Sequence, residues 1–363
     1  MPDPWCNSET PYPEELSAYQ RVVLSKVQEN SNSSASLDKS AYLDFLKFVS
    51  THGLRTATVM AIAGQLLSDK VNKDESWKRV ALLDKLQFDV FRHYWNKYRP
   101  EFSTFFLNST AHFQHAYFHL LKPEHFHYPP EQMNDEAHRD AILFGYQEMD
   151  ELIGEFLKLE RQGVMFVLST ALSQQPNPDG GSQYYRPRDI HGLLKSLDVH
   201  PIELLPVMAQ QFNAQFESEA TAQAARRKLE TVYWGDRQVF GFEKSEPNVL
   251  YFDNSLRCQV PKDAVVEFRG PSPRVVPYFE IFYRVPHTKS GAHHPDSVLW
   301  FKTGTHKIHR EKVSILNVLP TLLDYFNVPM PNEASMPREG HSLLSLMGLP
   351  RYSERLEGAA VGS

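Results

Sequence analysis

The stretch from Val164 to Leu168, VMFVL, is a continuous apolar run of the length of a β-strand. It follows residues 138–161, in which apolar side chains recur at the spacing of an amphipathic helix. Polar residues from Ser169 to Pro176 come directly after the run. A run of this kind is typical of a parallel strand that helices cover on both faces. The sequence therefore predicts a helix, a buried strand and a strand-end loop in succession.

An earlier part of the chain has the same order of elements. A helix is predicted from Trp77 to Tyr98, Pro100 ends it, and Thr104–Leu107 (TFFL) is predicted to form a short buried strand. The polar residues 108–115 follow, and they include two histidines. The repeated order predicts an α/β fold with a doubly wound, mostly parallel sheet flanked by helices. In such sheets ligands bind beyond the carboxyl ends of the strands.

The pattern changes outside these two regions. Helical spacing begins at Asp38, and about 184–266 mixes a helical part, 188–229, with short alternating segments, which predicts an inserted α+β subdomain. A strand is predicted at 297–302, and a helix kinked at Pro320 is predicted at 313–326. We divide the chain into a helical covering segment (1–100), a first α/β core part (101–180) and an inserted or covering subdomain (181–270). A second α/β core part (271–350) and a tail (351–363) follow.

The composition limits the functional class. Of the 363 residues 41% are apolar and 23% are charged, and no apolar run approaches the roughly 18 residues of a membrane span. The net charge of −6 argues against a nucleic acid polymer as partner. Two cysteines, Cys6 and Cys258, are too few for a disulfide framework or a structural zinc site. The low cysteine count and an amino terminus unlike a signal peptide predict a cytoplasmic protein. The sequence does not indicate its oligomeric state.

Histidine is abundant, with 16 copies, and imidazole is the commonest metal ligand of proteins. Several copies are grouped: His112, His115 and His119; His125 and His127; His293 and His294; His306 and His309. The ordinary interpretation of such groups is a helix face or loop on which imidazoles pair with carbonyls or carboxylates near the surface. We prefer this interpretation for His119 and His294.

Three segments of the chain resemble site motifs of one family. They are Phe105–His119 (FFLNSTAHFQHAYFH), Val164–Pro176 (VMFVLSTALSQQP) and Lys289–Gly304 (KSGAHHPDSVLWFKTG). In this order they are similar to a strand with an Asp-x-x-x-His pair, a strand ending in Ser-Asp-His-Gly, and a Gly-x-His-x-Pro-x-Gly segment of the alkaline-phosphatase superfamily. Within that superfamily they resemble the type I phosphodiesterases and nucleotide pyrophosphatases. The resemblance spans most of the chain and implies an alkaline-phosphatase-like fold.

The resemblance also implies candidate metal ligands. His115 falls on the histidine of the first motif, and His293 falls on the histidine of the third. Three other ligand positions of the family carry Ala111, Thr170 and Ala171. His112 lies beside the vacated aspartate position and is the third candidate, since imidazole ligates zinc as well as carboxylate does. The implied cofactor is a divalent metal, zinc or else manganese, unless the substitutions have removed it.

Three functions follow from this resemblance. The first is metal-dependent hydrolysis of a phosphodiester or nucleotide pyrophosphate bond in a phosphorylated small molecule. Under this hypothesis, the family's first strand and its Thr or Ser nucleophile are expected in sequence upstream of Met1. No catalytic residue is therefore assigned. The second is a pseudoenzyme that binds a phosphorylated ligand or a protein partner, and the substitutions favour it. The third is a single-metal hydrolase of another ester, with the three candidate histidines as ligands.

Other side chains are candidates for supporting roles. Lys289, Arg186 and Arg188 are candidates to pair with a substrate phosphate, with solvated surface charge as the ordinary interpretation. Asp296 is a candidate acceptor that orients His293. Strand-end hydroxyls without an evident activating base are interpreted as caps of the following helix or turn: Ser109, Thr110, Ser169 and Thr170.

Overall fold

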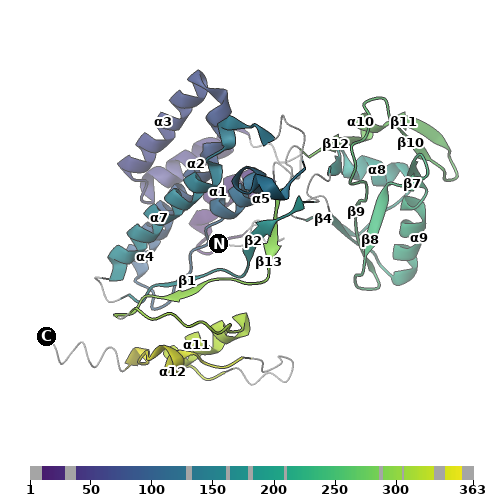
Figure 1. Cartoon of the computed structure of the whole chain (residues 1–363). Helices are drawn as coiled ribbons and strands as arrows, with labels where there is room; N and C mark the ends of the chain where they lie inside the picture. Colours follow the sequence, from purple (N-terminus) through teal and green to yellow (C-terminus); the bar gives the residue numbers. More distant parts are fainter. Residues whose placement is uncertain are drawn as a thin grey trace. The chain divides into compact units, whose positions relative to one another are not determined.

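A computed structural model gives the fold of the chain (Figure 1). It describes residues 10–28, 38–127, 133–160, 164–178, 183–207, 211–285, 289–304, 306–330 and 340–353. The predicted tail lies outside these residues apart from its first three positions. The chain divides into two compact units, the first made of Met1–Leu152 and Gln174–Ala292, the second of Ile153–Ser173 and His293–Ser363. Within the described ranges, no helix is both long and apolar enough to cross a membrane.

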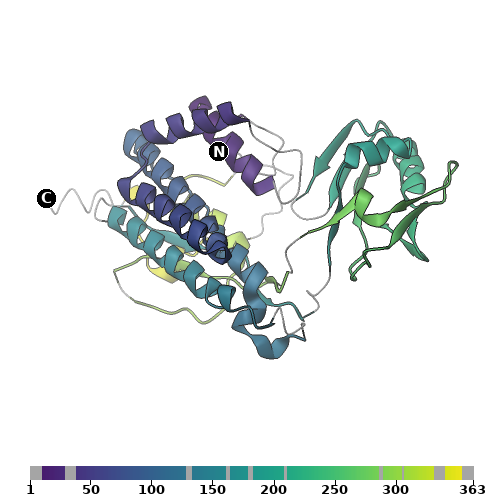
Figure 2. The ribbon, with the colours of Figure 1, turned by 90° about the horizontal axis from the view of Figure 1, so that it is seen from above.

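Helices form the amino-terminal part of the chain, and several of them run side by side (Figure 2). Their bounds are α1 (Ser17–Gln28), α2 (Lys39–Thr51), α3 (Thr56–Val71), α4 (Arg79–Tyr98), α5 (Ser109–Leu121) and α7 (Ala141–Glu160). Short 3-10 turns accompany them: η1 (Glu14–Leu16), η2 (Lys73–Lys78), η3 (Pro123–His125) and η4 (Glu136–His138). The helices predicted from Asp38, at 77–98 and at 138–161 are confirmed. Asp38 caps the first of these, because its carboxylate accepts a hydrogen bond from Ala41 N at 2.8 Å.

Two buried carboxylates of α4 hold the neighbouring helices. Asp89, which is 1% exposed, accepts a hydrogen bond from Arg55 N at 2.9 Å and pairs with the Arg55 guanidinium, just before α3. Asp84, which is 6% exposed, lies at the start of α5 and accepts hydrogen bonds from Ser109 and from Asn108 N–H. Burial raises the pKa of Asp84 to about 6, since these hydrogen bonds only partly offset the loss of hydration.

A mixed α+β part follows within the first unit. One four-stranded sheet has the order β4-β5-β9-β8: β4 (Glu203–Pro206), β5 (Phe212–Gln215), β9 (Val249–Asn254) and β8 (Phe240–Glu243). A second has the order β11-β10-β6-β7: β11 (Arg274–Pro277), β10 (Val265–Phe268), β6 (Val232–Trp234) and β7 (Arg237–Gln238). The remaining elements are α8 (Ile190–Ser196), α9 (Glu219–Leu229), α10 (Tyr278–Ile281) and the pair of β3 (Tyr185–Pro187) with β12 (Phe282–Arg284).

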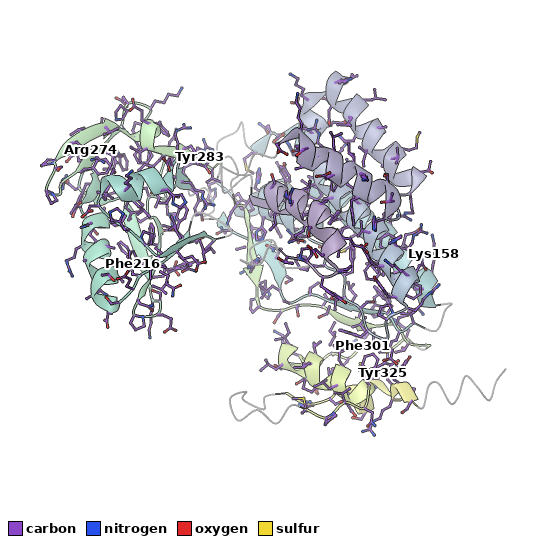
Figure 3. The ribbon with its side chains drawn as sticks, turned by 180° about the vertical axis from the view of Figure 1, so that it is seen from behind. Lys158, Phe216, Arg274, Tyr283, Phe301 and Tyr325 are labelled. Atoms are coloured by element: carbon purple, nitrogen blue, oxygen red, sulfur yellow. The ribbon has the colours of Figure 1, made fainter. Side chains whose placement is uncertain are left out.

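This α+β part has its own hydrophobic core (Figure 3). The core includes Phe212 and Phe252 of one sheet, Val266 of the other, and Leu229 of α9. The predicted mixture of helix and short strands is therefore confirmed for 184–266. The helical part predicted at 188–229 is only partly correct, because β4 and β5 separate α8 from α9.

The prediction of a doubly wound, mostly parallel sheet is wrong. All strand pairs of described register are antiparallel, and the sheets have two or four strands. The apolar run at 164–168 contributes only to β1 (Val167–Ser169), which is antiparallel to β14 (Leu299–Phe301). Residues 104–107, which the structure describes, form no strand, and Phe106 is 71% exposed. A short apolar run fixes neither the partner nor the direction of a strand, which explains the error.

The second unit ends in short helices: η6 (Ile315–Asn317), α11 (Val318–Tyr325) and α12 (Leu344–Met347). The strand predicted at 297–302 is confirmed as β14. The predicted kink at Pro320 is wrong because α11 begins at Val318. Pro320 then lies in the first turn, where a backbone N–H has no partner inside the helix, so the ring is tolerated.

Replacing Asp84 by Asn tests the role of this buried carboxyl group. Because folding raises its pKa from about 4 to about 6, its contribution to stability is full below pH 4 and is lost as the pH rises through 6. Relative to the variant, the wild type should lose about 1.4 kcal/mol of unfolding free energy between pH 5 and pH 8. Urea unfolding at both pH values measures this. Asp44→Asn, at an exposed position of α2, is the control, and parallel pH profiles for wild type and Asp84→Asn would contradict the expectation.

Candidate functional site

His115 of α5 is the point at which the three family-like segments meet. Its Nδ1 lies 2.8 Å from the carbonyl oxygen of Gly291, on β13 (Gly291–His294). Its Nε2 lies 3.2 Å from the side-chain nitrogen of Gln174, on β2 (Ser173–Pro176). β13 and β2 pair with each other. Contacts from two distant parts of the chain therefore converge on one half-buried imidazole.

These two contacts fix the tautomer of the His115 ring. The Gly291 carbonyl can only accept a hydrogen bond, so Nδ1 carries the proton. In the neutral ring Nε2 then holds a lone pair, which accepts the hydrogen bond from the Gln174 amide. An imidazole that donates Nδ1–H to a backbone carbonyl presents Nε2 as metal ligand or proton acceptor. His115 is thus oriented for either kind of chemistry.

A close approach of β13 to α5 makes this arrangement possible. Ser290 Oγ donates to Ala116 O at 3.0 Å, and Asn177 N donates to Ser290 O at 2.8 Å. A Cβ atom at position 291 would lie 2.4 Å from the backbone oxygen of Gln114. Only glycine fits at this distance, so Gly291 sets how near the strand comes to His115.

The other histidines of α5 differ in their surroundings. His112 is half-buried and lies three residues before His115, a spacing that places both on one face of the helix. Its ring is edge-on to Phe113, with 5.9 Å between the centroids. His119 is 7% exposed and packs near Phe126. The interpretation of His119 as a near-surface residue is therefore wrong, because its side of the helix faces the interior.

His293 belongs to the second unit, and its side chain is exposed. In the same unit Asp296 pairs with Lys312 at 2.6 Å, and this hydrogen bond lowers the pKa of the carboxyl group. The backbone N–H of Asp296 donates to His294 Nδ1 at 3.1 Å. These contacts give Asp296 a cationic partner of its own, and its proposed role in orienting His293 stays a prediction.

The strand-end hydroxyls make local contacts. Thr110 Oγ1 donates to the carbonyl oxygen of Gly145 on α7 at 3.1 Å. Thr170 Oγ1 accepts a hydrogen bond from Val298 N at 3.0 Å, which closes the end of the β1–β14 pair. Both contacts agree with a structural role.

The candidate cations fall into different environments. Lys289 and Arg257 both lie by the ring of Tyr184, with Nζ and Cζ at 5.6 and 5.1 Å from its centroid. Partial desolvation and the neighbouring Arg257 lower the pKa of Lys289. Arg186 is 1% exposed and lies over Phe212, so it is an interior residue and not a solvated charge. Arg188 is exposed and donates to Phe279 O at 2.8 Å.

The donor chemistry at His115 suits a metal ligand, but it does not by itself make a metal site. Across the described residues, no three His, Cys, Asp or Glu side chains are grouped so that they could hold a metal ion. His115 therefore fits the role of one ligand, and the described residues do not complete its set.

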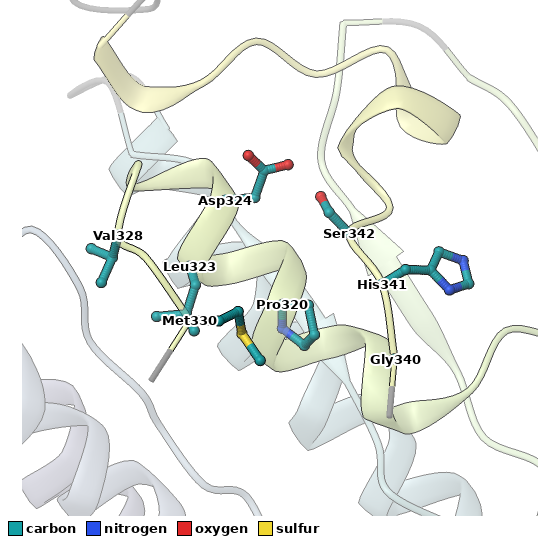
Figure 4. A pocket seen from close by; sticks show the side chains of 8 residues that line it. All are labelled: Pro320, Leu323, Asp324, Val328, Met330, Gly340, His341 and Ser342. Carbon is teal, nitrogen blue, oxygen red and sulfur yellow. The ribbon is translucent and has the colours of Figure 1, made fainter. Parts of the chain in front are cut away.

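A separate pocket of about 470 Å³ lies in the second unit (Figure 4). Pro320, Leu323 and Met330 form apolar walls, and Asp324 and Ser342 add polar groups. Hydrogen bonds from Ser342 and Arg351 lower the pKa of Asp324. The pocket adjoins residues 331–339, which lie outside the described ranges, and it contains no residue of the three motifs.

Comparisons with protein-family models, with curated proteins and with solved structures found no match for this chain. The assignment of residues to roles therefore depends on the geometry and on the motif resemblance. Sequence reasoning missed Gln174 and Gly291. Both lie inside the quoted motifs, but nothing in the sequence indicates that their polar groups face His115.

Gly291→Ala should separate β13 from α5. The added methyl group meets the Gln114 carbonyl, and such overpacking costs about 1–3 kcal/mol of unfolding free energy. Thermal unfolding followed by circular dichroism measures the loss. Gly304→Ala is the matched control, because a Cβ there meets nothing within 4 Å. Equal melting temperatures for the two variants would contradict the close approach.

Proposed function

We propose that this chain is a hydrolase of the type I phosphodiesterase and nucleotide pyrophosphatase kind, acting with a divalent metal, zinc or manganese. Its substrate would be a small molecule with a phosphodiester or pyrophosphate bond. The observation that supports this is the meeting of three motif-like segments at His115, through contacts with Gly291 and Gln174. Segments that carry a shared site are expected to converge in this way, whereas unrelated loops are not.

His115 would serve as a ligand through Nε2, and His112, on the same helix face, is the further candidate within the first unit. A bound cation would activate the attacking group and neutralise charge on the phosphate oxygens. The Gly291 carbonyl holds the His115 ring in the required tautomer. The Gln174 amide occupies Nε2 and would have to give way to a cation.

Replacing His115 by Ala tests this function. The wild type should bind zinc or manganese, show a melting temperature that falls on chelation, and hydrolyse bis(4-nitrophenyl) phosphate when loaded with metal. The variant should bind the metal more weakly by a factor of about 10–100 or more. Loss of a residue that only orients a metal ligand already has an effect of this size. Metal analysis of purified protein and thermal unfolding with and without chelator are the measurements.

His125→Ala is the matched control, because His125 is an exposed imidazole whose described ion pair, with Glu124, is long at 3.8 Å. It should behave as the wild type does. A wild type that binds neither metal, with a melting temperature unchanged by chelation, would refute the metal-dependent function.

Binding of a phosphorylated ligand without hydrolysis is a second candidate function. It is supported by the substituted ligand positions and by the Lys289–Arg257 pair. Desolvation lowers the pKa of Lys289, and repulsion from the neighbouring Arg257 lowers it further; a bound phosphate would relieve this repulsion. Both side chains can donate charge-assisted hydrogen bonds to phosphate oxygens.

Lys289→Ala should weaken phosphate binding in this case. Loss of one charge-assisted hydrogen bond costs about 1.5–3 kcal/mol, which is a 10-fold to 150-fold rise in Kd. Titration calorimetry with inorganic phosphate and with 4-nitrophenyl phosphate provides the measurement. Lys262→Ala removes an exposed lysine elsewhere and should have no effect. Equal affinities for the wild type and Lys289→Ala would count against this pair as the binding site.

A further inference from the structure

The side-chain amide of Gln174 has one bonded end and one unbonded end. Its nitrogen lies 3.2 Å from His115 Nε2 and donates to the lone pair of that ring nitrogen. Its oxygen, Oε1, is buried, and no hydrogen-bond donor among the described residues contacts it. A buried carbonyl oxygen in this situation costs about 1–3 kcal/mol of unfolding free energy. The oxygen therefore indicates that the site takes a further partner, either a hydrogen-bond donor or a cation.

The chemistry of the two side chains favours a cation. His115 Nε2 and Gln174 Oε1 both offer a lone pair, and neither atom carries a hydrogen in this tautomer. A hydrogen-bond donor would serve one of these atoms, whereas a cation between them would serve both. Imidazole nitrogen suits zinc and amide oxygen suits manganese, so a divalent cation of this row can take both as ligands.

The distance between the side chains suits two ligands of one ion. A half-turn of the Gln174 amide exchanges its oxygen and nitrogen, which sets Oε1 near the present place of the nitrogen, 3.2 Å from His115 Nε2. Ligand atoms about 2.1 Å from one ion lie about 3.0 Å apart at an octahedral angle and about 3.4 Å apart at a tetrahedral angle. The observed separation falls between these values. In the metal-free protein two lone pairs at this distance would repel, so the amide presents its N–H to the ring.

One pair of strands supports both groups. Gln174 lies on β2, and β13, which pairs with β2, carries the Gly291 carbonyl that holds the His115 ring at 2.8 Å. Asn177, just beyond β2, donates from its backbone N to Ser290 O at 2.8 Å. All of these residues belong to the first unit. The backbone under both side chains is thus held, and only the amide of Gln174 has to turn.

Gln174 adds a ligand of a kind that the histidine pattern does not include. The described residues contain no group of three His, Cys, Asp or Glu side chains that could hold a metal ion, but an amide oxygen is also a ligand of divalent cations. In the family-like segment Val164–Pro176, Thr170 and Ala171 stand at the two ligand positions. Gln174 follows in the same segment, so it supplies an oxygen where the resemblance implies that two ligands are replaced.

We propose that Gln174 is a ligand of the divalent cation and binds it through Oε1, beside His115 Nε2, after a half-turn of its amide. The proposal rests on the metal-dependent function proposed above and assigns a new residue to that site. Giving up the N–H···N hydrogen bond costs about 0.5–1.5 kcal/mol, so the cation binds less tightly than at a preformed pair. Two protein ligands leave positions open for water and for substrate oxygens.

Zinc and manganese affinities of Gln174 variants test the proposal, with titration calorimetry on the full chain as the measurement. Gln174→Glu keeps the shape of the side chain and adds a charged oxygen, so it should bind each metal more tightly than the wild type. Gln174→Ala removes the oxygen and should bind about 10-fold more weakly or worse, since loss of a residue that only orients a ligand already has this effect. Thermal unfolding in chelator verifies that each variant is folded.

Gln175→Glu and Gln175→Ala are the matched controls. Gln175 is the next residue of β2, it is exposed, and its side chain leaves the strand on the opposite face. Both variants should bind the metals as the wild type does. If Gln174→Ala does not fold, the comparison of Gln174→Glu with the wild type decides alone.

The order of affinities separates the roles that Gln174 can have. A residue that only shields Nε2 would give tighter binding in Gln174→Ala than in the wild type. A residue that only orients the ring through its N–H would give binding in Gln174→Glu that is weaker than in the wild type. Either result overturns the proposal and leaves the metal-dependent function standing, because the wild type still binds the ion. A wild type that binds neither metal refutes both.

Discussion

The buried carboxyl group of Asp84 at the start of α5 is the contact from which the site is built. Asp84 lies on α4 and is 6% exposed. It accepts hydrogen bonds from Ser109 and from the backbone N–H of Asn108, where α5 begins. Burying a carboxyl group is costly unless it is hydrogen-bonded, and this group is only partly compensated. Its hydrogen bonds hold the first residues of α5, the helix that carries His112 and His115. Asp89, five residues along α4, acts in the same way on the residue before α3.

β13 and β2 complete the surroundings of His115 on α5. Gly291 permits the strand to approach the helix, the Gly291 carbonyl selects the tautomer of His115, and Gln174 occupies the remaining ring nitrogen. Each step is a short-range contact between segments far apart in the chain. A hydrolase and a phosphate-binding protein would share this arrangement, and they would differ in whether a cation replaces the Gln174 amide.

The parts of the fold that the sequence predicts are those that local periodicity determines. α2, α4 and α7 are such parts, because their apolar residues repeat at helical spacing over three or more turns. The sheet could not be predicted, since 164–168 and 104–107 are short apolar runs whose pairing depends on distant strands. At the site, the motif at 105–119 contains His115, on which the contacts converge, whereas Gln174 was missed because its contact with His115 appears only when β2 is placed beside α5. Arg186 was judged a surface charge, and only the packing over Phe212 reveals that it is buried.

The central claim is that distant segments hold His115 with Nδ1 protonated and Nε2 as acceptor. Long-range proton–nitrogen NMR of the histidine side chains in the nitrogen-15-labelled protein tests it most directly, with His115→Gln to assign the ring signals. The proton of neutral His115 is expected on Nδ1, and Nε2 is expected to show the nitrogen shift of an unprotonated ring nitrogen. A neutral His115 ring that carries its proton on Nε2 would contradict the account, because the Gly291 carbonyl could then not be its partner.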